Sequence, residues 1–128
     1  MTSLDFEVSA NHDVYMGLSS VNRREPDIYE ILIGCWGNNQ SFIRQCPESN
    51  VSGYCEPTVR EITPNILSGY GIYDRFWVTF DNSTIAVGRH GTSTPFMEAT
   101  YPAPLDINYV GVFTAYGSDG YWKFHSFC

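Results

Sequence analysis

The sequence predicts an all-β protein: an antiparallel β-sandwich or jelly-roll-like single domain over residues 1–128. Apolar and polar residues alternate with a period of two along much of the chain, which is typical of half-buried strands. No long stretch shows apolar positions at helical spacing, and 11 Gly and 7 Pro residues disfavour long helices. A length of 128 residues suits one domain.

Strands in the first half of the chain are predicted from short apolar patterns. Residues 4–8 and 14–18 alternate as strands with one buried face do. Residues 28–34 form a nearly continuous apolar run, which is typical of a central strand covered on both faces. Glu30 interrupts that run, and because a buried carboxylate needs a partner, we expect an ion pair with Arg44 on the adjacent strand. Shorter strands are expected at 41–45 and 58–63.

Two hairpins are predicted in the second half. Strands at 76–80 and 85–87 flank four turn-forming residues, and strands at 107–116 and 121–127 flank the Gly-rich segment 117–120. About nine short strands result, at spacings that suit a sandwich. His125 falls on the face opposite Trp122, which is expected in the core. The phenylalanines expected to alternate into the core include Phe6, Phe76, Phe80, Phe113 and Phe124.

Composition excludes several classes of protein. Aromatic residues make up 16% of the chain and charged residues only 16%, so intrinsic disorder is not expected. The net charge is −7 and the seven Lys and Arg residues are dispersed, so no nucleic acid partner is expected. No run of about 18 apolar residues occurs, so no membrane insertion is expected either.

The N-terminus and the cysteines bear on localisation. Residues 1–7 have neither a basic nor an apolar region, so we expect either a protein made without a signal peptide or a mature form with an added start methionine. An even number of cysteines in a short chain favours disulfides and an extracellular, secreted location. We expect Cys46 to pair with Cys55 and Cys35 with Cys128. Three connectivities are open, as is the alternative of four reduced thiols in a cytosolic protein.

The sequence contains no motif that selects an active site. The three histidines are dispersed, and neither H-E-x-x-H nor G-x-S-x-G occurs. Without a C-x-x-C pair or a calcium loop, no metal is expected. Gly69-Tyr70-Gly71 lacks the third glycine of the dinucleotide fingerprint and does not open a helix. We therefore expect no catalytic residue and no cofactor.

Three loops carry the groups that a sugar needs. An aromatic face packs against the C–H patches of a sugar, while amides, carboxylates and guanidinium groups bind its hydroxyls. Residues 34–41 and 116–122 combine aromatic and polar side chains, and residues 88–91 place two polar ones between glycines. The structural alternative is that the aromatics belong to the core and the Asn residues form turns. The expected sugar-binding residues are Trp36, Asn38, Asn39, Arg89, His90, Tyr116 and Asp119.

Three segments of the chain resemble the motifs of one protein family. Residues 29–38 and 41–44 read YEILIGCWGN and SFIR. Residues 76–78, 85–88 and 95–96 read FWV, IAVG and PF, and residues 107–114 read INYVGVFT. In this order the segments are similar to those of the farnesoic acid O-methyltransferase-like (FAMeT) domain, over about residues 4–127.

The resemblance implies two different activities. The family name implies an S-adenosylmethionine-dependent methyl transfer to farnesoic acid, for which the residues offer no cofactor loop and no base. The same domain occurs in extracellular, lectin-like proteins, and the resemblance points to a stand-alone marine-invertebrate lectin of the galactose-binding type.

We therefore expect a non-enzymatic lectin that recognises terminal galactose or N-acetyllactosamine-type glycans on cell surfaces and glycoproteins. Because a single sugar site is weak and a lectin that agglutinates cells must be multivalent, a homo-oligomer is expected. The alternatives are a farnesoic acid O-methyltransferase and a protein-binding adhesion module.

Overall fold

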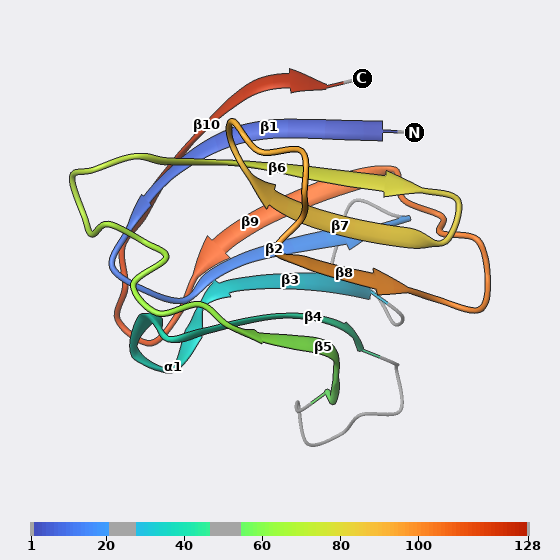
Figure 1. The fold of residues 1–128 in the computed structure, drawn as a ribbon, viewed down its shortest axis with the longest axis horizontal. Helices are drawn as coiled ribbons and strands as arrows, with labels where there is room; N and C mark the ends of the chain where they lie inside the picture. The colour runs from blue at the N-terminus through green and yellow to red at the C-terminus, as the bar shows by residue number, and fades with distance from the viewer. Residues whose placement is uncertain (1, 21–27, 47–54, 128) are drawn as a thin grey trace.

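The structure is a computed structural model that describes residues 2–20, 28–46 and 55–127. It contains ten strands in those residues, and they form two antiparallel sheets that pack face to face (Figure 1). The predicted all-β sandwich is confirmed. The strands are β1 (Thr2–Ala10), β2 (Val14–Ser19), β3 (Ile28–Gly34), β4 (Gln40–Cys46), β5 (Pro57–Ile62), β6 (Asp74–Asp81), β7 (Thr84–Arg89), β8 (Met97–Thr100), β9 (Tyr109–Thr114) and β10 (Gly120–Phe127).

The two sheets have five strands each. Sheet A has the order β10-β1-β6-β7-β8, and sheet B has the order β5-β4-β3-β2-β9. The core lies between them and is built from alternate residues of each strand, as the period of two predicts. Phe6 on β1 is buried, and its ring lies 6.0 Å from the rings of both Phe76 and Phe124. Phe124 itself is 38% exposed on the edge strand β10, so its predicted burial in the core is wrong. Trp122 packs against the same core, as expected.

Outside the core, one ion pair was predicted from the sequence and a second was not. The Nε of Arg44 lies 3.0 Å from Oε1 of Glu30, whose side chain is only 2% exposed, so the predicted ion pair is confirmed. His125 points away from the core and lies 2.6 Å from a carboxylate oxygen of Glu7.

Three elements differ from the prediction. The segment 97–100 forms β8, a strand too short to show an alternation. The first hairpin is confirmed, but its turn has two residues because Asp81 still pairs with Thr84. The second predicted hairpin is wrong: β9 pairs with β2 in sheet B, while β10 pairs with β1 in sheet A. The Gly-rich turn between them therefore crosses from one sheet to the other.

One of the two expected disulfide pairings is absent from the structure. Cys35 is a free, buried thiol, so the expected bridge between Cys35 and Cys128 is wrong. Cys55 takes part in a disulfide and is buried against Ile28. The side chains of Cys46 and Cys128 lie outside the described residues, so the pairing of Cys46 with Cys55 stays a prediction.

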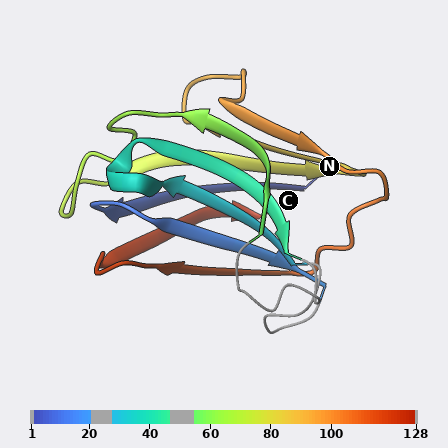
Figure 2. The ribbon, with the colours of Figure 1, turned by 90° about the horizontal axis from the view of Figure 1, so that it is seen from below.

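The strand directions gather one set of loops at a single end of the sandwich. Because neighbouring strands are antiparallel and β1 leads into β2 through three residues, β1, β3, β5, β7 and β9 all run toward the same end. The loops that follow these strands lie there, and we call this side the loop end. Both termini lie at the opposite end (Figures 1 and 2). Within the described ranges no helix is long and apolar enough to cross a membrane.

Candidate functional site

Asp13, between β1 and β2, joins two of the loops at the loop end. Its backbone N–H donates to the carbonyl of Gly34 at 2.9 Å, and its own carbonyl accepts from the N–H of Ala115 at 3.2 Å. Its buried carboxylate accepts a hydrogen bond from Nδ1 of His12 at 2.5 Å. The loop after β3, which carries Trp36, and the turn after β9, which carries Tyr116, are thereby held on either side of β2.

Trp36 lies in α1 (Cys35–Asn38), a single tight turn between β3 and β4. Trp36 and Gly37 have left-handed φ angles of 53° and 67°. The side chain of Asn38 closes the turn: its amide donates to the carbonyl of Leu67 at 2.8 Å, and its Oδ1 accepts from the N–H of Leu67 at 3.1 Å. The amide of Asn39 donates to the carbonyl of Trp36 at 3.0 Å. Both predicted amides therefore hold the loop that displays Trp36.

Tyr116 lies in a turn that is braced from three sides. The N–H of Ser118 donates to the carbonyl of Ala115 at 3.2 Å, and the hydroxyl of Thr114 donates to the carbonyl of Ser118 at 2.6 Å. The N–H of His12 donates to the Ser118 hydroxyl at 3.3 Å. These contacts fix the turn while leaving the Tyr116 side chain free of the core.

The backbone of both aromatic residues is strained. Six non-glycine residues in the described ranges have a left-handed φ, and four of them are Asp or Asn, which tolerate it. The other two are Trp36 and Tyr116, at 53° and 55°. They are also the most exposed aromatics described, at 68% and 82%. Strain of about 1–3 kcal/mol at such a residue is characteristic of ligand-contact positions.

The outer face of sheet B extends this aromatic display. Tyr15 and Phe113 face each other across β2 and β9 with ring centroids 4.7 Å apart. Burial, together with the smaller effects of the nearby Cys35 and Tyr116, raises the pKa of Tyr15 to about 12. Phe113 is 43% exposed on this face, so its predicted place in the core is wrong. We call Tyr15, Trp36, Phe113 and Tyr116 the aromatic surface.

The remaining predicted residues lie elsewhere at the loop end. Arg89 is the last residue of β7 in sheet A, and His90 begins the loop that follows. The guanidinium of Arg89 lies 5.8 Å from the ring centroid of Phe96, and the N–H of His90 donates to the carbonyl of Arg75. Asp119 is exposed in the Tyr116 turn. No contact among the described residues joins Arg89 or His90 to the aromatic surface.

Sequence reasoning missed a second group of exposed aromatics, which we call the Tyr70 cluster (Tyr70, Tyr73 and Tyr121). The rings of Tyr70 and Tyr121 are 5.8 Å apart, and Nζ of Lys123 lies 4.1 Å from the ring centroid of Tyr73. A hydrogen bond with Tyr121 raises the pKa of Tyr70, and the charge of Asp119 adds to this effect. Asp119 therefore faces this cluster. The cluster joins β10 to the loop before β6, and because its tyrosines on the two segments are at least 48 residues apart in the chain and form no recognisable motif, the sequence holds no signal for it.

The buried group beneath the aromatic surface is the thiol of Cys35. Cys35 is 4% exposed, and burial raises the pKa of its thiol to about 12, with the charge and hydrogen bond of Asp13 acting in the same direction. The Asp13 carboxylate also accepts the hydrogen bond from Nδ1 of His12. A cysteine nucleophile reacts as the thiolate, and burial beside the Asp13 carboxylate keeps Cys35 a protonated thiol at neutral pH.

Alkylation tests this state of Cys35. At pH 8 a pKa of about 12 in place of 9.0 leaves about 1,000-fold less thiolate, so iodoacetamide is expected to label Cys35 at least 100-fold more slowly in the native protein than in urea. Peptide mapping by mass spectrometry measures the rate at this residue alone. Equal rates in the two conditions would contradict the burial of the thiol, and absence of labelling in urea would mean that Cys35 is bridged.

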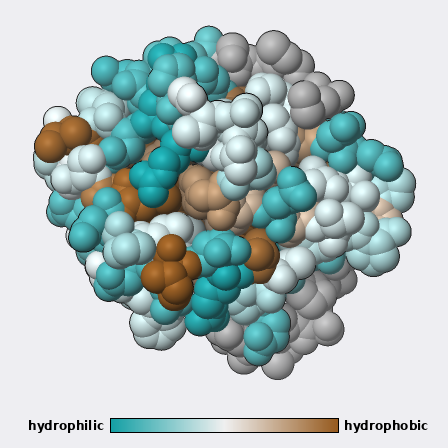
Figure 3. Space-filling view, viewed as in Figure 1, coloured by the Kyte–Doolittle hydropathy of each residue, from teal (hydrophilic) through white to brown (hydrophobic). Residues whose placement is uncertain are grey.

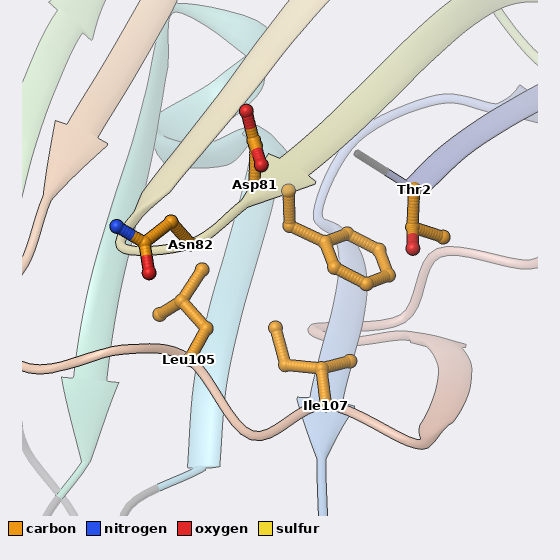
Figure 4. A pocket seen from close by; sticks show the side chains of 6 residues that line it. Thr2, Asp81, Asn82, Leu105 and Ile107 are labelled. Atoms are coloured by element: carbon orange, nitrogen blue, oxygen red, sulfur yellow. The ribbon is translucent and has the colours of Figure 1, made fainter.

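Two hollows lie away from the loop end. One of about 210 Å³ is lined by Thr2, Asp81, Asn82, Leu105 and Ile107, together with Phe80 (Figure 4). An adjoining hollow of about 340 Å³ shares Thr2, Phe80 and Ile107 with the first. Its further lining residues include Leu4, Val110 and Phe124. The described residues hold no cluster of three metal-ligating side chains. Figure 3 shows separate hydrophobic patches among hydrophilic residues on the face in view.

The comparisons with known proteins agree with the motif segments. A family model described as farnesoic acid O-methyl transferase matches residues 1–127. No curated protein and no solved structure matches the chain. Because the match covers nearly the whole length, the chain belongs to the farnesoic acid O-methyltransferase family.

Proposed function

We propose that the protein is a lectin that binds carbohydrate at the aromatic surface and does not catalyse a reaction. The observation that carries this proposal is the display of Trp36 and Tyr116. Two bulky rings are held in a backbone conformation that they disfavour, and both are turned into solvent. A fold does not maintain such strain for packing, because neither ring is packed. Flat exposed rings offer the apolar faces on which the C–H patches of a sugar stack.

Polar groups for the sugar hydroxyls lie beside the rings. His12 uses Nδ1 for Asp13, so Nε2 of its partly exposed ring is left for a ligand. Asn39 is exposed next to Trp36, and its Oδ1 is an acceptor that the loop does not need for its own amide hydrogen bonds. Terminal galactose and N-acetyllactosamine-type glycans, which combine a C–H patch with several hydroxyls, are the ligands that we propose.

Binding without catalysis is supported by the character of the site. The aromatic surface is open, and the cysteine beneath it is a protonated thiol at neutral pH. A methyltransferase must enclose S-adenosylmethionine next to its acceptor, and enclosed sites of this kind are concave. On this proposal the partners are glycans of cell surfaces and glycoproteins, and the protein acts outside the cell, where disulfides persist.

A glycan array followed by calorimetry tests the proposal. The protein is expected to prefer galactose-terminated glycans. Trp36→Ala and Tyr116→Ala are each expected to weaken binding about fivefold, because one stacked ring contributes on the order of 1 kcal/mol. Trp36→Phe keeps a ring and should retain most of the affinity.

Tyr70→Ala is the matched control, since it removes an exposed ring from the Tyr70 cluster at the same end of the sandwich. It should leave binding unchanged. Loss of binding in Tyr70→Ala, with Trp36→Ala unaffected, would move the site to that cluster. A folded protein that binds no glycan, or that binds S-adenosylmethionine in calorimetry, would overturn the lectin proposal. We also expect binding to survive EDTA.

A further inference from the structure

The two sheets end in four edge strands, and three of them carry features that prevent pairing with another chain. β5 begins with Pro57 and carries Arg60 and Glu61. β8 has only four residues, one of them Glu98. β10 carries Lys123 and shifts register against β1. Charges, proline, short length and bulges are the means by which proteins keep edge strands from pairing.

β9 has none of these features. Its sequence, YVGVFT, contains no charge and no proline, and it pairs with β2 over six consecutive positions without a register shift. Tyr109 and Phe113 are 46% and 43% exposed on its outer face, with Gly111 between them. Figure 2 shows β9 at one border of the sandwich, and no strand in the described residues pairs with its free side.

Gly111 is a glycine in the middle of β9 that no contact or backbone angle of the described chain requires. A glycine inside a strand is unfavourable, and it commonly marks a place where another backbone comes close. A Cβ atom at Gly111 would meet nothing within 4 Å, and the residue has no left-handed φ that would require glycine. Nothing within the described chain therefore needs a glycine at this position.

We propose that β9 pairs in antiparallel fashion with β9 of a second copy of the chain, forming a two-fold dimer with one continuous ten-stranded sheet. The N–H of Ala115 bonds to Asp13 next to β2, and bonded positions alternate along an antiparallel ladder. The backbone groups of Val110 and Val112 therefore point to the free side. With the two-fold axis at Gly111, Val110 of one copy pairs with Val112 of the other.

A second copy fits this edge better than an unrelated partner. The same register places Tyr109 of one copy opposite Phe113 of the other, and this pair occurs twice, once on each side of the two central glycines. The side chains of β9 are therefore complementary to those of a second β9. Each copy has one unprotected edge, and pairing two copies uses both, so the assembly closes as a dimer. Each chain carries a charge of −7, and an uncharged strand is where two such chains approach with the least repulsion.

This inference does not rest on carbohydrate binding. If the proposed function also holds, the dimer displays two aromatic surfaces on one sheet face, which supplies the multivalency that a weak sugar site needs.

Sedimentation equilibrium of Gly111→Lys tests the dimer. The unaltered protein is expected at about 29 kDa, twice the chain mass of 14.5 kDa, and Gly111→Lys at 14.5 kDa, because two ammonium groups would meet at the axis. Ile62→Lys is the matched control. It adds the same charge at an exposed apolar residue of another edge, β5, and should remain a dimer.

Gly111→Cys gives a second measurement that does not depend on weakening the dimer. Non-hydrogen-bonded positions of an antiparallel pair lie about 4.5 Å apart at Cα, within the range for a disulfide. With oxidised glutathione as the electron acceptor, the two thiols are expected to form a covalent dimer. Three outcomes would each overturn the proposal. The unaltered protein could be a monomer, it could form an assembly larger than a dimer, or the dimer could survive Gly111→Lys while Gly111→Cys fails to cross-link.

Discussion

The Gly88→Ala variant is expected to lose about 3 kcal/mol of unfolding free energy, although it adds a single methyl group. A Cβ atom at position 88 would lie 2.0 Å from Cζ2 and 2.2 Å from Cε2 of Trp77, the residue opposite it in the β6–β7 pair. The indole cannot step aside without loss, because its N–H is shared between the carbonyls of Arg89 and Thr92 at 3.0 and 2.9 Å. Chemical denaturation measures the change.

A double-mutant cycle separates this clash from other effects of the substitution. In a Trp77→Leu background the ring is absent, so Gly88→Ala is expected to cost less than about 1 kcal/mol. An equal cost in both backgrounds would mean that Trp77 is not the obstacle. The indole also anchors the start of the loop after β7, so we expect faster amide exchange at His90 in Gly88→Ala than in the unaltered protein.

The fold could be predicted where a residue's neighbours on adjacent strands decide its environment. The alternation placed Phe6 in the core, and the charge of Glu30 within an apolar run required the Arg44 partner that lies 3.0 Å away. The pairing of β9 and β10 could not be predicted, because a Gly-rich turn suits a hairpin and a sheet crossing equally. Phe113 was misplaced because β9 is apolar on both faces, so alternation does not show which face is buried.

The candidate site could be predicted only in part, for a related reason. Trp36 and Tyr116 lie in glycine-containing loops, a position that left burial and exposure of Trp36 equally open, and both side chains are exposed. An amide that closes a loop and one that binds a sugar look alike in sequence, so both roles stayed open for Asn38, whose side chain closes the loop by binding Leu67. Tyr15 was missed because only the pairing of β2 with β9 brings it beside Phe113.

The Gly34→Ala variant is expected to lose about 3 kcal/mol of unfolding free energy and to disturb the aromatic surface as well. Gly34 has a φ of +73°, and a Cβ atom there would lie 2.6 Å from Cδ1 of Leu67 and 2.9 Å from Oδ1 of Asn38. Leu67 is buried, and its backbone is held by the amide of Asn38, so relieving the clash breaks the contacts that close the Trp36 loop. Part of the cost is the left-handed backbone and part is the clash.

Gly91→Ala isolates the backbone part. Gly91 has a comparable φ of +90°, but a Cβ atom there would meet nothing within 4 Å. Denaturation of this control should show a loss of about 1 kcal/mol, the cost of a left-handed alanine alone. Equal losses in the two variants would contradict the role of Leu67. If the lectin proposal holds, Gly34→Ala should also weaken glycan binding under conditions where it is fully folded, whereas Gly91→Ala should not, because only Gly34 connects the core of sheet B to the loop that displays Trp36.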